Sequence, residues 1–118
     1  MTLARTQVGV MWTVSVLLAV VFLFVGGTLL LGGPRVVEGF KHFGYPGWFR
    51  FVIGILQVIG GVGLLIPRYA AIAASYLAII MLGALISHVR AGDGFLGLLP
   101  ALIVLFLVGT VIWLRGEE

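Results

Sequence analysis

The sequence contains no cysteine and very little charge. Without cysteine, the chain has no disulfide framework, no thiol–disulfide relay, no cysteine-ligated iron–sulfur cluster and no cysteine lipid anchor. Charged residues make up 9% of the 118 residues and hydrophobic residues 62%, whereas a typical soluble domain carries about 25% charged residues. A soluble domain of this length could not bury so much apolar surface, so lipid must cover part of it.

The few charges that are present lie between long apolar runs. A charged side chain at the centre of a bilayer costs about 2.5–3.5 kcal/mol on insertion scales. Four stretches of the chain contain no charged residue: 6–34, 51–67, 69–88 and 94–114. A spanning helix needs about 20 residues. The sequence therefore predicts an all-α membrane protein, a bundle of four transmembrane helices at about residues 10–31, 49–66, 69–89 and 96–114.

The loop between the first two predicted spans has the pattern of a short amphipathic helix. Pro34 suits the first position of a helix, and Gly44 could end it. Apolar residues share one helical face, namely Val36, Val37, Phe40 and Phe43. Polar residues share the other face, namely Glu38, Lys41 and His42, at a spacing that favours pairing of Glu38 with the two cations. We expect the apolar face to lie in the bilayer or across the mouth of the bundle.

Four spans would bring both histidines of the chain to one face of the membrane. His42 lies in the first loop, and His88 lies at the end of the third span, close to Arg90 and Asp93. Imidazoles and carboxylates together can bind a ligand, relay protons, or hold a metal or haem, and the same residues also serve as interfacial anchors. No metal-ligand spacing or catalytic constellation accompanies them, so we predict no metal site and lean against an enzyme.

Gln57 is the most conspicuous polar residue within a predicted span. An amide in lipid should face the bundle and find a partner there. That partner is either another helix, which is a structural role, or a polar group of a bound molecule such as a quinone carbonyl. The candidate ligand-binding residues are therefore Gln57, His88, Arg90, His42, Glu38 and Lys41. We predict no cofactor from these residues alone. Of the known cofactors, a quinone is the one that they could bind.

Small residues recur at helical spacing in the third predicted span, where Ala70, Ala74 and Ala78 form a ridge. Such ridges allow close helix packing, because no hydrophobic effect drives helix association within lipid. The ridge indicates either packing inside the bundle or contact with a second copy of the chain.

An ordered series of short segments resembles the DoxX-like family of small four-span membrane proteins. The resemblance covers about residues 10–115 and rests on the order and spacing of the segments together. They are FLFVGG (22–27), VEGF (37–40), FGYPGW (43–48), IGILQ (53–57), GLLIPR (63–68), MLGALISHVRAGD (81–93) and LPAL (99–102). The resemblance implies a single transmembrane domain over residues 1–118.

Two positions depart from the family's pattern. Members often carry Lys where this chain has Thr28, and Glu where it has Gln57. If those residues form an ion pair or a proton site, this chain replaces both with neutral side chains, which favours a neutral, structural bundle. Similar proteins are associated with quinone-linked sulfur oxidation, oxidative-stress complexes or assembly. The lack of cysteine argues against direct thiol chemistry by this chain.

The leading functional hypothesis is a small subunit or partner-binding module, with a membrane redox complex as the candidate assembly. The main alternative is a redox enzyme subunit that binds a quinone or a lipid near the first loop and the end of the third span. A small-solute permease is the third hypothesis. We expect the partners to be the lipid bilayer and either other membrane subunits or a second copy, with no nucleic acid. We also expect a multi-pass integral protein of a bacterial or archaeal cell membrane.

Overall fold

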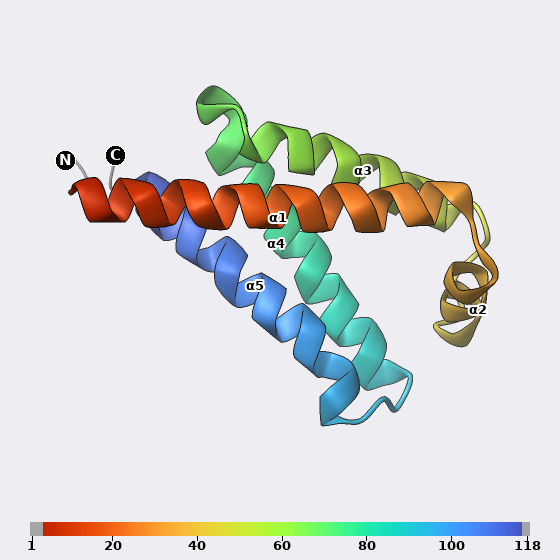
Figure 1. The fold of residues 1–118 in the computed structure, drawn as a ribbon. Coiled ribbons are helices and arrows are strands. Elements are labelled where there is room, and N and C mark those ends of the chain that lie inside the picture. Colours follow the sequence, from red (N-terminus) through yellow and green to blue (C-terminus); the bar gives the residue numbers. More distant parts are fainter. Residues whose placement is uncertain (1–3, 117–118) are drawn as a thin grey trace.

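The computed structural model describes residues 4–116, and this part of the chain consists of helices joined by short connections (Figure 1). There are five helices among these residues: α1 Arg5–Leu31, α2 Pro34–His42, α3 Phe49–Leu64, α4 Pro67–Arg90 and α5 Phe95–Gly116. The all-α class, the short helix in the first loop and the order of the elements agree with the prediction. Helix boundaries differ from the predicted spans by a few residues.

Of the four predicted spans, three correspond to helices that are long enough to cross a membrane. α1, α4 and α5 are each long and apolar enough to cross a membrane, whereas α3 is apolar but has only 16 residues. At 1.5 Å per residue, α3 covers about 24 Å, compared with a hydrocarbon core of about 30 Å. By length and composition alone, the described residues therefore give three candidate spans and one shorter apolar helix.

Glycine and proline end and begin the helices where the sequence predicts. Gly32 has a φ of 72°, and its N–H donates to the carbonyl oxygen of Thr28, which closes α1. Pro34 occupies the first turn of α2 and Pro67 the first turn of α4. A Cβ at Gly32 would also lie 2.6 Å from the Arg50 guanidinium, and Arg50 Nη1 donates to the carbonyl oxygen of Leu29 at 2.5 Å. The Arg50 guanidinium thus provides a hydrogen-bond donor for a backbone carbonyl oxygen in the last turn of α1.

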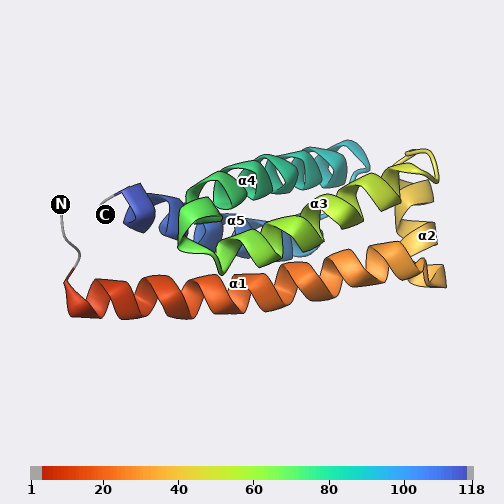
Figure 2. The same ribbon diagram turned by 90° about the horizontal axis from the view of Figure 1, so that it is seen from above.

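The four longer helices form two packed pairs. α1 lies along α3, and α4 lies along α5, in layers that are separated most clearly in Figure 2. α3 also packs on α4, and α1 on α5, which closes the bundle. Figure 1 shows that α5 crosses α1 toward its N-terminal end and that α4 crosses it near its middle, and both helices run away from α1 toward the α2 end. The two pairs therefore meet at one end of the bundle and diverge at the other.

The core sits where the pairs meet, and it is built from aliphatic side chains with one aromatic ring. Its buried members are Leu18, Phe22, Leu64, Ala73, Ala74, Leu77, Met81, Val108 and Val111. Ala70 and Ala74 are fully buried, so the predicted alanine ridge is used inside the bundle. The Tyr76 hydroxyl donates to the Leu56 carbonyl oxygen at 2.6 Å and joins α4 to α3.

The backbones of α1 and α3 approach each other closely at Gly26 and Gly54. A Cβ built on Gly26 would lie 2.8 Å from the carbonyl oxygen of Gly54, and one on Gly54 would lie 3.0 Å from the carbonyl oxygen of Gly26. Contacts this short leave no room for a side chain on either residue. Such approach is how helices gain packing contacts in lipid, where burial of apolar surface gives them no net advantage.

Replacement of Gly26 by alanine should therefore destabilise the bundle. The added methyl group would collide with the Gly54 carbonyl oxygen and with Val58, and we expect Gly26→Ala to lower the free energy of unfolding by about 1–3 kcal/mol. Gly27→Ala is the matched control, since a Cβ there meets no atom within 4 Å. Denaturant unfolding in detergent micelles measures both. Equal effects of the two substitutions would contradict a tight α1–α3 contact.

Candidate functional site

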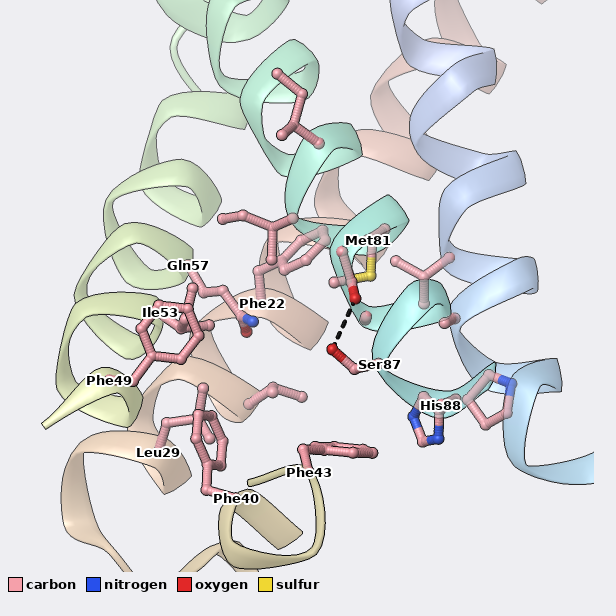
Figure 3. A pocket seen from close by; sticks show the side chains of 18 of the residues that line it. Phe22, Leu29, Phe40, Phe43, Phe49, Ile53, Gln57, Met81, Ser87 and His88 are labelled. Atoms are coloured by element: carbon pink, nitrogen blue, oxygen red, sulfur yellow. Dashed lines mark hydrogen bonds between the residues drawn. The ribbon is translucent and has the colours of Figure 1, made fainter. Parts of the chain in front are cut away.

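A cavity of about 610 Å³ lies at the end of the bundle where the two helix pairs diverge (Figure 3). All five helices contribute to it. The lining residues are Val21, Phe22, Val25, Leu29, Phe40, Phe43, Tyr45, Phe49, Ile53, Gln57, Ile79, Ile80, Met81, Gly83, Ala84, Ser87, His88, Pro100, Ala101 and Val104. Its size falls within the usual range for small-molecule sites, and its walls are mostly hydrophobic with a few polar groups, as such sites are.

Aromatic rings cover the cavity at the α2 end. Phe40 and Phe43, on the apolar face of α2, line it together with Tyr45 from the next loop and Phe49 from the start of α3. The rings contact one another, with centroids 5.1 Å apart for Tyr45 and Phe49 and 6.2 Å apart for Phe40 and Tyr45. Of the two positions expected for the apolar face of α2, the one across the mouth of the bundle is therefore the one observed.

Gln57 points into the cavity from the middle of α3 (Figure 3). The residue is 5% exposed, and its side-chain oxygen Oε1 is buried without a hydrogen-bond partner among the described residues. An unpaired buried carbonyl costs about 1–3 kcal/mol. Of the two roles predicted for Gln57, the interhelical hydrogen bond is not made through this oxygen. The amide is instead available to an occupant of the cavity.

His42 and His88 are brought together by Asp93. His42 Nε2 lies 3.0 Å from Asp93 Oδ1, and His88 Nδ1 lies 2.7 Å from Asp93 Oδ2. Each imidazole donates an N–H to one carboxylate oxygen. The hydrogen bonds from His42 and then from His88 lower the pKa of the Asp93 carboxyl below its ordinary value of 3.8. The two histidines thus lie at one end of the bundle, as predicted, and Asp93 bonds to both of them.

Two further contacts fasten the α2 region to the end of α4. Arg90 Nη2 donates to the carbonyl oxygen of Phe43 at 3.0 Å, and the hydroxyl groups of Tyr45 and Ser87 hydrogen-bond each other. We call this whole set the α2 clasp; it comprises His42, Tyr45, Ser87, His88, Arg90 and Asp93, with the Phe43 carbonyl. The clasp holds the aromatic cover over the cavity. His88 and Ser87 belong to the clasp and to the cavity wall at once.

Four of the six predicted ligand-binding residues do not line the cavity, and two of these, His42 and Arg90, belong to the α2 clasp. Glu38 and Lys41 are exposed on the outer face of α2 and do not line it. The expected pairing of Glu38 with Lys41 or His42 is not formed among the described residues, because His42 bonds to Asp93 instead. Pairs at this spacing contribute only about 0.2–0.5 kcal/mol when exposed, so a competing carboxylate readily displaces them. Within residues 4–116, no group of three His, Asp or Glu could hold a metal ion.

Sequence reasoning missed most of the cavity wall. The rings of Phe43, Tyr45 and Phe49 and the hydroxyl of Ser87 were not among the candidates, and Asp93 was noted only as a neighbour of His88. The signal that could have found them is the FGYPGW segment at 43–48. Three aromatic residues and two glycines in one connection are more than a simple loop requires.

Together, the apolar helices and the cavity within them define an α-helical membrane protein with an internal site. The sequence pattern of the DoxX-like family matches residues 13–111, and the chain belongs to this family of membrane proteins. The chain is also 36% identical over 93 residues to a Bacillus subtilis (strain 168) protein described as "Uncharacterized protein YdgD". That match covers 74% of this chain and 82% of the relative. No solved structure matches the chain.

Loss of the Asp93 charge should loosen α2. Asp93→Asn removes the carboxylate that accepts from both histidines, and we expect several-fold faster amide exchange in α2 than in the wild-type protein. Glu38→Gln is the matched control, because it removes a carboxylate from an exposed position of α2 that makes no ion pair among the described residues. Hydrogen–deuterium exchange with mass spectrometry measures both. A similar change in the two variants would contradict the clasp.

The same contact gives a pH dependence with a defined sign. Because the pKa of Asp93 is lower in the folded protein than its ordinary value of 3.8, its contribution is complete above about pH 4 and is lost as the pH falls through the lowered value. Amide exchange of α2, corrected for its intrinsic rate, should not increase between neutral pH and about pH 4 and should increase below it. Asp93→Asn should abolish this acid transition.

Proposed function

We propose that this DoxX-like protein is a multi-pass protein of a bacterial or archaeal cell membrane that binds a membrane-dissolved ligand, a lipid or a quinone, inside a four-span bundle. The observation that carries the proposal is the cavity of about 610 Å³, which has apolar walls and one unpaired buried amide, that of Gln57. A cavity of this kind suits a molecule that is mostly apolar and has a small polar head.

The packing of α3 supports four spans. α3 lies in the same layer as α1 and packs along it, and it connects directly to α4. An apolar helix held between α1 and α4 shares their environment, although its 16 residues are fewer than a typical span requires. Bilayer thinning or interfacial residues at its ends accommodate such a short span. Trp48 and Phe49 stand at one of these ends.

The shape of the bundle supports entry from the lipid. Val21 and Val25 of α1 and Pro100 of α5 all line the cavity, and all three are exposed. They belong to two helices that diverge toward α2 (Figure 1). The aromatic cover and the α2 clasp meanwhile separate the cavity from the end of the bundle. A ligand dissolved in the bilayer therefore has a shorter path into the cavity than a ligand dissolved in water.

The structure disfavours the permease hypothesis but is compatible with the subunit hypothesis. A permease needs a continuous path, but Leu64, Leu77, Val108 and Val111 are fully buried where the helix pairs meet, and their packing disfavours one. A role as a subunit of a larger membrane assembly, with a redox complex as the candidate, is compatible with a ligand site. In that role the protein would present its ligand to a partner subunit, and we propose no catalytic step for this chain alone.

Cysteine labelling tests the number of spans. Because the sequence contains no natural cysteine, only the introduced cysteine can react. We expect single cysteines at Glu38→Cys and Gly94→Cys to react with a membrane-impermeant maleimide from the same side of the membrane. Arg68→Cys should react only from the opposite side. If α3 did not span, positions 38 and 94 would be labelled from opposite sides, because only α4 would separate them.

Filling the cavity should remove the ligand. Gly83 lines the cavity, and a Cβ there meets no atom within 4 Å, so Gly83→Phe places a ring in the open space. We expect the amount of bound lipid or quinone to fall about tenfold or more, as measured by native mass spectrometry of protein purified gently from its own membranes. Gly109→Phe is the control, because Gly109 is exposed on α5, is equally open and lies outside the cavity.

Two outcomes of that experiment would change the proposal. Bound ligand at the wild-type level in Gly83→Phe would show that the cavity is not the binding site. A wild-type protein that carries a second protein and no small molecule would favour the subunit hypothesis instead.

A further inference from the structure

We propose that the ligand carries a neutral hydroxyl head that donates a hydrogen bond to Gln57, so that the site selects a long-chain or prenyl alcohol or phenol. The inference rests on the proposed ligand-binding function and adds the chemistry of the head group. Three properties of the cavity lead to it: the absence of charge on its walls, the unpaired amide, and the engagement of its other polar groups.

We expect a neutral head, because no side chain with a permanent charge lines the cavity in the described part of the chain. No Lys, Arg, Asp or Glu belongs to the lining among the described residues. The nearest guanidinium of the clasp, that of Arg90, is directed to the carbonyl oxygen of Phe43 and lies 5.5 Å from the centre of the Tyr45 ring. A carboxylate or phosphate placed among these apolar walls would lose its hydration without gaining a counter-ion. Fatty acids and phospholipid head groups are therefore disfavoured.

The head must also be a hydrogen-bond donor, because the unpaired atom is an acceptor. Gln57 Oε1 is buried without a partner, and the amide makes no other hydrogen bond among the described residues. A hydroxyl group can donate to the amide oxygen and also accept from the amide nitrogen. A ketone, an ester or an ether can only accept, which would leave the oxygen unpaired in an apolar site; of the two redox forms of a quinone, the reduced, phenolic form is therefore the one that fits. This difference distinguishes an alcohol from its carbonyl or ether counterpart.

The remaining polar groups of the wall do not offer a competing donor. The Ser87 hydroxyl donates to the Gly83 carbonyl oxygen at 2.8 Å (Figure 3) and also bonds the Tyr45 hydroxyl. His88 uses its Nδ1 on Asp93, and in the neutral tautomer that donates through Nδ1 the other ring nitrogen, Nε2, is again an acceptor. An oxygen that only accepts thus finds little to bind except the amide nitrogen of Gln57, whereas a hydroxyl finds an acceptor there as well.

Competition between matched probes tests the proposal. The protein, in lipid nanodiscs, is exposed to hexadecan-1-ol, methyl hexadecyl ether and hexadecanoate at equal mole fractions, and native mass spectrometry gives the occupancy of each. We expect the alcohol to be favoured over the ether by about tenfold, the size of effect for leaving a buried carbonyl unpaired. We expect hexadecanoate to bind less than the alcohol.

Variants at Gln57 connect that preference to the amide. Gln57→Leu should bring the ratio of bound alcohol to bound ether close to one. Gln57→Met keeps a similar side-chain volume and should give the same ratio, so it replaces the leucine variant if that variant does not fold. Ser15→Ala is the control. Ser15 Oγ is likewise buried without a partner, but it lies outside the cavity, so the ratio should stay at the wild-type value.

The outcomes separate the two proposals. Equal binding of alcohol and ether by the wild-type protein would overturn the hydroxyl inference and leave the ligand site standing, as would preferred binding of hexadecanoate. A preference for the alcohol that persists without the Gln57 amide would also overturn it. If no probe binds to the wild-type protein, and the protein purified from its own membranes carries no ligand that Gly83→Phe removes, the ligand-binding function itself fails.

Discussion

Helices in a bilayer gain little from burying apolar side chains against each other, because lipid solvates those side chains equally well. The contact between α1 and α3 at Gly26 and Gly54 answers this constraint by bringing the two backbones together. It makes these two helices a rigid layer. α4 and α5 then pack on that layer at an angle, so contact is close at one end and lost at the other. The cavity is the space that this crossing leaves.

A cavity at a diverging end needs a cover, and α2 supplies it. Its apolar face contributes Phe40 and Phe43 to the wall, while His42 on its polar side reaches Asp93. The cover is therefore attached by polar bonds at the edge of the bundle, where water is near and such bonds are replaceable, and not by packing in the core. This arrangement is consistent with a ligand that enters from the lipid while the polar end stays closed.

The sequence predicts the helices well because their signals are local. Runs without charge, Gly32 before Pro34, and Pro67 between two spans act within a few residues of where they stand. It also predicts that His42 and His88 lie at the same end of the bundle, since that follows from the topology; that Asp93 brings them together is seen only in the structure. It does not predict the cavity, because the crossing angle of the two helix pairs depends on side-chain contacts across the whole bundle. The pairing of Glu38 with its helical neighbours is not formed for the related reason that a distant carboxylate, Asp93, competes for His42.

The family resemblance implies charged residues at the positions of Thr28 and Gln57, but the side chains of these two residues have different surroundings in the structure. The Thr28 hydroxyl donates to the carbonyl oxygen of Val25 at 2.7 Å, so its own helix satisfies it. Gln57 Oε1 is left without a partner, and Thr28 is not part of the cavity wall that Gln57 faces. The two are therefore not a neutral substitute for an ion pair. A bundle that was only structural would gain from replacing Gln57 with an apolar residue of similar size, so the packing of the helices alone does not account for this amide.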